Sequence, residues 1–114
     1  MGHNLMGVLM VKLEINKIIK TYGTSDVFTI CKCLGLWIYI LPLGKIKSHY
    51  IYKKKRHVLF INDNLSVNEQ IFLCTIMLGH IVLHKRYIGF STIEQKEAKE
   101  FALEFIKIAS NACN

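Results

Sequence analysis

The feature that most limits how this chain folds is an apolar segment from Gln70 to His84. Ser66 and Glu69 precede it at the spacing of a capping box, in which the two side chains bond free backbone N–H groups at a helix start. Apolar residues then occupy nearly every face of the predicted helix. Such a helix is stable only when other elements surround it, so we expect it at the centre of a domain.

The rest of the chain supplies short elements that can surround this helix. Apolar spacing, glycine stops and runs of aromatic and β-branched residues predict helices at 11–22 and 24–35, strands at 36–40, 46–52 and 57–61, and a last helix from 91 onward. The fold class that follows is α+β. It has two N-terminal helices, a small three-stranded, mainly antiparallel sheet and two C-terminal helices.

Length and composition indicate one compact domain, residues 1–114. A chain of 114 residues has no room for two independent cores, and a hydrophobic fraction of 52% excludes a disordered protein. The sequence leaves open whether residues 1–10 fold. No apolar stretch reaches the roughly 18 uninterrupted residues of a membrane-spanning helix, and the N-terminus lacks a signal-peptide pattern. We therefore expect a cytoplasmic protein that does not associate with a membrane.

The cysteines are predicted to be free thiols rather than a redox or zinc motif. Cys31 and Cys33 are separated by one residue, which fits neither a thioredoxin-like pair nor a zinc knuckle. Cys74 and His80 lie six residues apart, about 120° around a helix. This angle argues against a thiol nucleophile with His80 as its base.

The central segment also carries a recognisable motif. Residues 74–84, Cys-Thr-Ile-Met-Leu-Gly-His-Ile-Val-Leu-His, resemble the Ala-His-Glu-Leu-Gly-His-x-x-Leu-His segment of the ImmA/IrrE-type zinc metallopeptidases. Residues 43–52, 60–66 and 97–102 resemble further segments of that family, in the same order. The resemblance extends from about Gly23 to Phe105 and implies a zincin-like minimal fold.

The chain departs from this family where the chemistry takes place. A zinc peptidase needs two histidines one helical turn apart and a glutamate that takes a proton from the metal-bound water. By the resemblance, His80 stands at the second histidine, Ile76 at the first and Met77 at the glutamate. Loss of a general base alone lowers the rate by about two to four orders of magnitude. We therefore expect no catalysis and no cofactor.

A displaced metal site remains as an alternative. The family's third ligand comes from the following helix, and its position falls on Gln95. His80 and His84 are still one turn apart, with Glu94 and Glu97 on either side of Gln95. A zinc-dependent peptidase with a rearranged site would use these two histidines and two glutamates.

The positive charge suggests where a partner binds. Part of the formal net charge of +7 is concentrated in one predicted turn, the basic hairpin, which contains Lys53, Lys54, Lys55, Arg56 and His57. Such a cluster can meet phosphates or an acidic protein surface, and a solvated turn has the same composition. Tyrosines interleaved with the basic residues are also typical of single-stranded nucleic-acid binding.

The main hypothesis is a non-catalytic pseudopeptidase that acts as a protein-binding or inhibitory module. The resemblance implies that a phage or mobile element encodes it, and that its partner is a helix-turn-helix repressor or a host defence factor. We expect the partner to contact the basic hairpin and the rim of the former cleft at His80 and His84. A small basic nucleic-acid-binding protein is the remaining alternative.

Overall fold

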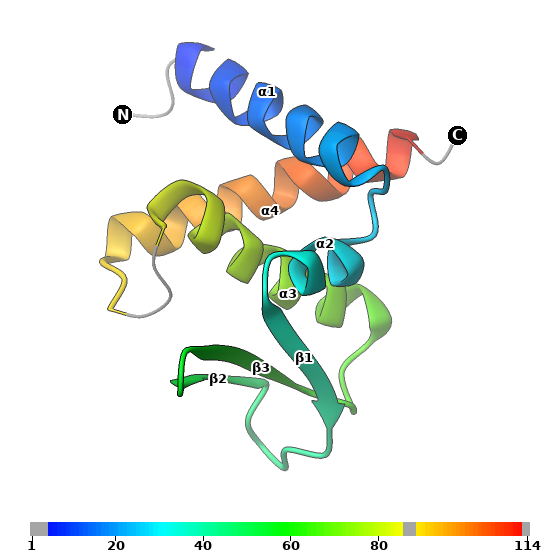
Figure 1. Cartoon of the computed structure of the whole chain (residues 1–114), viewed down its shortest axis with the longest axis vertical. Helices are drawn as coiled ribbons and strands as arrows, with labels where there is room; N and C mark the ends of the chain where they lie inside the picture. Colours follow the sequence, from blue (N-terminus) through cyan, green and yellow to red (C-terminus); the bar gives the residue numbers. More distant parts are fainter. Residues whose placement is uncertain (1–4, 86–88, 113–114) are drawn as a thin grey trace.

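The computed structural model describes residues 5–85 and 89–112, and it confirms the α+β fold class (Figure 1). Within these residues the chain forms four helices and one three-stranded sheet, and the helices lie on one side of the sheet. The elements are α1 (Leu5–Tyr22), α2 (Val27–Cys33), β1 (Leu36–Leu41), β2 (Ser48–Lys53), β3 (Arg56–Asn62), α3 (Val67–His84) and α4 (Thr92–Ala112).

The helix starts follow local hydrogen bonds. Ser66 Oγ accepts a bond from the Glu69 N–H at 3.1 Å, as the capping box predicted. Ser91 and Glu94 form the complete reciprocal pair at the start of α4. The start of α1 was predicted six residues too late, since the helix already includes residues 5–10. Residues 1–4 lie outside the described part of the chain.

The sheet has a different topology from the one expected. Its strand order is β1-β3-β2, with β3 parallel to β1 and antiparallel to β2. The prediction of a mainly antiparallel sheet is therefore corrected to a mixed sheet. The physical reason is the connection between β1 and β2, which passes the end of β3 instead of turning back as a hairpin.

Asn62, the last residue of β3, binds this connection. Its side-chain Nδ2 donates to the carbonyl oxygens of Gly44 and Ile46, at 2.9 and 2.8 Å. Its Oδ1 accepts bonds from the backbone N–H groups of Leu43 and Asn64. Asn62 is 3% exposed, so water does not readily replace these bonds. One buried amide therefore satisfies the backbone of the connection that gives the sheet its order.

The Asn62→Ala substitution should lower the free energy of unfolding by about 2–3 kcal/mol, because it leaves several buried backbone groups without partners. Urea denaturation followed by circular dichroism measures this loss. Asn64→Ala is the matched control, since Asn64 is exposed and its substitution should change stability by less than about 0.5 kcal/mol. Equal stability of the two variants would contradict the assigned role of Asn62.

Helix α3 lies at the centre of the domain, as predicted. It packs against α4 on one side and contacts α2 and β3 on the other. The buried core around it includes Leu78 of α3, Phe101 and Phe105 of α4, and Leu36 and Ile61 of the sheet. By length and composition alone α3 would also be able to cross a membrane, with 18 residues at a mean hydropathy of 1.2. The core helix of a globular protein passes the same test, and the absence of membrane association stays a prediction.

Gly79 lets α3 and α4 approach closely. A Cβ atom at this position would lie 3.0 Å from the backbone oxygen of Ala98 and 3.1 Å from Cδ1 of Phe101. Ala98 is fully buried on the facing side of α4. Only glycine therefore fits at this crossing without a shift of the backbone, and the crossing fixes the position of the residues that follow Gly79 relative to α4.

Candidate functional site

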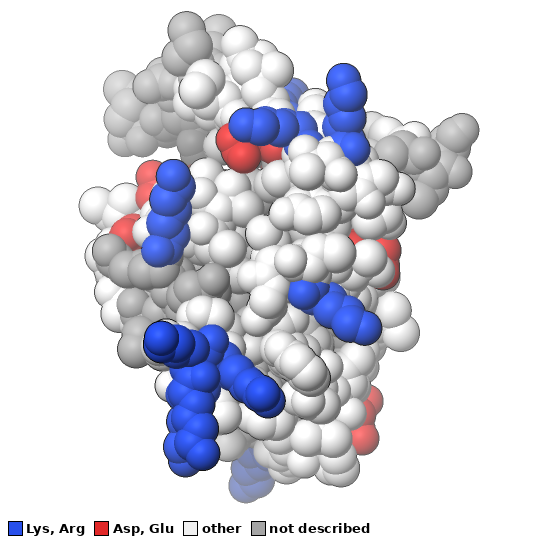
Figure 2. Space-filling view, in the orientation of Figure 1, with Lys and Arg blue, Asp and Glu red and all other residues white. Residues whose placement is uncertain are grey.

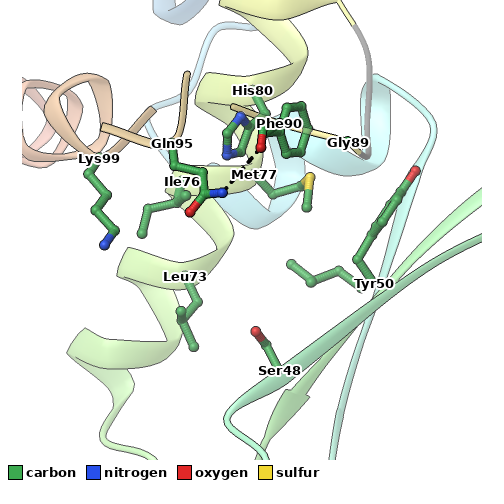
Figure 3. A pocket seen from close by; sticks show the side chains of 11 residues that line it. Ser48, Tyr50, Leu73, Ile76, Met77, His80, Gly89, Phe90, Gln95 and Lys99 are labelled. Carbon is green, nitrogen blue, oxygen red and sulfur yellow. Dashed lines mark hydrogen bonds between the residues drawn. The ribbon is translucent and has the colours of Figure 1, made fainter. Parts of the chain in front are cut away.

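A groove of about 550 Å³ opens between α3, the edge strand β2 and the start of α4 (Figure 3). Side chains of Ser48 and Tyr50 line it from β2, and Leu59 lines it from β3. The α3 wall consists of Leu73, Ile76, Met77 and His80. Gly89 and Phe90 lie between the helices, and α4 contributes Gln95 and Lys99. The α3 wall is thus hydrocarbon and thioether up to the single imidazole of His80.

The groove brings together four positions that the sequence analysis singled out. Ile76, Met77 and His80 face it from α3, and Gln95 faces it from α4. These are the positions matched to the first histidine, the catalytic glutamate, the second histidine and the third ligand. Segments 15 or more residues apart in sequence therefore converge as the resemblance implied.

His80 is held by stacking on Phe90, and a hydrogen bond from Gln95 holds Phe90 in turn. The ring of Phe90 stacks on its imidazole at a centroid distance of 3.5 Å and an interplanar angle of 14°. Gln95 Nε2 donates a bond of 3.2 Å to the backbone oxygen of Phe90 (Figure 3). Gln95 therefore positions the segment whose aromatic ring covers His80, which is itself only 5% exposed.

His80 continues into a chain of three polar side chains. Its Nδ1 lies 3.2 Å from Nδ1 of His84, and Nε2 of His84 lies 3.0 Å from Oε1 of Glu97. When both rings are neutral and Glu97 accepts from His84, His84 must accept at Nδ1 and His80 must donate. His84 points towards Glu97 and does not line the groove, so only His80 of the pair faces it.

Comparison with known proteins identifies the fold family. Residues 31–111 match the IrrE N-terminal-like domain of the M78 peptidases. The chain belongs to this family. It is 29% identical over 105 residues to "Uncharacterized immunity region protein 2" of Bacillus phage phi105, covering 90% of this chain and 63% of that protein. It is 29% identical over 94 residues to metallopeptidase ImmA of Bacillus subtilis strain 168, covering 82% and 56%.

The chain spans about three fifths of the length of these two relatives. No solved structure matches it. Because the family is named for peptidases, the donor atoms of the groove decide whether it could hold a catalytic metal ion.

The groove of this IrrE-like chain does not fit a catalytic zinc ion. Such a site needs three protein ligands, normally nitrogen, oxygen or sulfur donors with available lone pairs. Among the four family positions only His80 has a donor of the kind that catalytic zinc sites use, because Ile76 has no lone pair, Met77 offers a thioether and Gln95 a neutral amide. Across residues 5–85 and 89–112, no group of three or more His, Cys, Asp or Glu side chains is placed to share a metal ion.

The alternative ligand set is only partly assembled in the IrrE-like fold. His80, His84 and Glu97 form one hydrogen-bonded chain. Glu97 contacts Nε2 of His84, the ring nitrogen that does not face His80. Glu94 is separate from them, since its carboxylate caps the backbone N–H of Ser91. A carboxylate behind a histidine orients that histidine and is not itself a ligand.

The basic hairpin divides into two parts. Lys54 and Lys55 form its turn, both with positive φ, and Lys53 and Arg56 flank it, all four of them exposed. Figure 2 shows basic side chains gathered on one part of the surface. His57 belongs to the opposite surface, where Tyr52 stacks on its ring at 4.4 Å and the Tyr50 hydroxyl bonds its Nδ1. Burial lowers the pKa of His57 below its ordinary value of 6.5. His57 therefore adds no charge to the hairpin at neutral pH.

The buried thiols lie away from the groove. Sγ of Cys74 is 3.6 Å from Sγ of Cys31, and both residues are fully buried. The hydrogen bond to Cys31, together with burial, raises the pKa of the Cys74 thiol above its ordinary value. Cys74 is therefore poorly suited to act as a nucleophile, because it lies away from the groove and its raised pKa disfavours the thiolate. Cys113 lies outside the described residues.

Phe90 is the groove residue that sequence reasoning missed. Its position directly before the N-cap Ser91 is one where apolar side chains often pack back onto the helix start. That signal places Phe90 near Gln95, four residues after the cap, as the hydrogen bond between them shows. It does not reveal the stacking on His80, which depends on the crossing of α3 and α4.

Restoring the family residues should create a metal site. The triple variant Ile76→His, Met77→Glu and Gln95→Glu places two histidines and a carboxylate around one point, and it should bind one zinc ion per chain by isothermal titration calorimetry. A control variant keeps Ile76 and carries only the two glutamate substitutions, and it should bind zinc much more weakly. A folded triple variant that takes up no zinc would show that the four positions do not converge on one point.

Proposed function

We propose that this protein is a pseudopeptidase, which binds an extended segment of a partner protein in the groove and does not cleave it. The observation that carries the proposal is the composition of the α3 wall. Leu73, Ile76 and Met77 present hydrocarbon and thioether surface where a peptidase of this family would need a ligand and a base. Such a surface favours binding of apolar side chains and supplies no group that activates water.

The edge strand β2 supports binding of an extended segment. In the strand order β1-β3-β2, one edge of β2 has no strand partner among the described residues. An extended peptide can add to such an edge through backbone hydrogen bonds, with alternate side chains entering the neighbouring pockets. Ser48 and Tyr50 of β2 line the groove, so a peptide on this edge would lie beside the apolar wall of α3.

The charges near the groove favour a partner with acidic residues. Lys99 lines the groove from α4, and the basic hairpin ends β2 and begins β3. Charge complementarity of this kind increases the association rate and selects among partners more than it raises affinity. A partner segment with apolar residues in its centre and acidic residues at one end matches this arrangement.

The names of the relatives support a role connected with phage immunity. One of them is called an immunity region protein of a phage, and the other a metallopeptidase. We propose that a phage or mobile element encodes this chain, that it acts in the cytoplasm, and that its partner is a repressor or a host defence factor. In this role the protein would inhibit its partner by occupying a surface of the partner and not by proteolysis.

Selection from a displayed library of random linear peptides tests the groove. The protein should enrich peptides with apolar residues and an acidic end, and mass spectrometry should recover them intact after incubation. Met77→Lys and Leu73→Lys each place an unpaired charge on the α3 wall, which should weaken binding of the selected peptides by about tenfold or more.

Leu103→Lys is the matched control, because Leu103 is 61% exposed on α4 and lies outside the groove. It should bind the selected peptides as the unchanged protein does. Peptides that bind equally well to the Met77 and Leu73 variants would exclude the groove as the binding site. Peptides that are cut, with cutting stopped by a chelator, would instead favour the peptidase with a rearranged site.

A further inference from the structure

The face of the sheet turned away from the helices carries exposed aromatic side chains. Leu36, Leu59 and Ile61 are buried against the helices, so the alternating residues of the same strands point outward. On this outer face Trp37 is 51% exposed and Tyr39 42% exposed. None of the four described helices covers it (Figure 1).

The aromatic rings of the outer face are arranged next to one another and next to a cation. Tyr39 of β1 pairs with Phe60 of β3, and their rings stack at a centroid distance of 5.9 Å. The Arg56 guanidinium lies over the Trp37 ring at 5.8 Å from its centroid. The face therefore combines flat π surfaces with a positive charge in contact with one of them.

The net charge of the protein resides in the segment that forms this face. Residues 27–62 contain seven of the fifteen basic residues and none of the eight acidic ones. The remaining eight basic residues equal the eight acidic residues, so the whole formal charge of +7 belongs to this segment. One of the seven, Lys47, pairs with Glu69 of α3 at 3.9 Å, and the outer face presents its aromatic rings beside the exposed basic residues 53–56.

The turn of the basic hairpin has lysines at two positions whose backbone conformation favours asparagine and glycine. Lys54 and Lys55 adopt φ values of 53° and 62°, as in a two-residue hairpin turn that normally selects Asn and Gly. Non-glycine residues in this conformation carry a backbone strain that a glycine would avoid. Two lysines at these positions extend the cationic surface beyond the end of β2 and β3.

We propose that the outer face of the sheet binds single-stranded nucleic acid, with unpaired bases stacked on Trp37, Tyr39 and Phe60 and phosphates contacted by Lys53 to Arg56. Stacking of bases on aromatic side chains beside a basic track is the general mode of binding to single strands. A duplex does not expose its bases for such stacking. This surface is separate from the groove, so the inference does not depend on the proposed pseudopeptidase function.

Trp37 makes the test direct because it is the single tryptophan of the chain. Titration with an oligothymidine of about 15 nucleotides should quench its fluorescence, and the anisotropy of a labelled oligonucleotide should rise over the same range. The Tyr39→Ala variant should bind roughly 5- to 100-fold more weakly, since it loses one stacking partner. Leu103→Ala, a change of similar exposure on α4, should leave the affinity unchanged.

Salt dependence separates phosphate contacts from other binding. With up to four hairpin cations involved, a plot of log affinity against log salt should have a slope of about −2 to −3. Lys53→Gln should make this slope shallower by about 0.7, whereas Lys107→Gln on α4 should not change it.

Three results would each overturn the proposal. One is an absence of both quenching and anisotropy change, and another is an unchanged affinity in Tyr39→Ala. The third is equally tight binding of a polyglutamate peptide or of the matching duplex. The first of these would show that the face binds acidic proteins, and the second that it attracts nucleic acid only by charge.

Discussion

The close crossing of α3 and α4 at Gly79 is the contact on which the candidate site depends. A Cβ atom at this position would lie 3.0 Å from the backbone oxygen of Ala98 and 3.1 Å from Cδ1 of Phe101, so the two helices cross more closely than a side chain here would comfortably allow. His80 follows directly, and His84 one turn later meets Glu97 of α4. Protein interiors are packed densely enough that a shift at such a crossing displaces the neighbouring side chains as well. The groove, the histidine chain and the position of Gln95 therefore all follow from one helix contact.

The groove is apolar at the two positions that the family resemblance matches to a zinc ligand and the catalytic glutamate. Met77 packs against the core and Ile76 is half-buried, so each stabilises the fold by less than the roughly 1.5–3 kcal/mol of a fully buried side chain. The side-chain amide of Gln95 donates a hydrogen bond to the backbone oxygen of Phe90, and the Phe90 ring covers one face of His80. Gln95 and His80 thus have structural contacts of their own, and the α3 side of the groove is apolar apart from His80.

The sequence predicted those features that depend on neighbouring residues. The Ser66 cap of α3 appeared as expected, because a cap needs only residues within one helical turn. The sheet order was not predictable in this way, since it rests on the buried Asn62 amide and a connection about 18 residues before it. The four groove positions were located by the family resemblance, as periodicity alone does not assign them. His57 was grouped with the basic hairpin by its place in the sequence, and in the structure it alternates in phase with the buried Leu59 and Ile61 on the inner face of the sheet.

The central claim is that the groove functions without a metal ion. Elemental mass spectrometry of protein purified without chelator tests this most directly. The account predicts zinc, iron and manganese contents far below one equivalent per chain, in the unchanged protein and in a His80→Ala variant alike. One equivalent of any of these metals that disappears in His80→Ala would contradict the account, because His80 would then have to be a ligand of a working metal site.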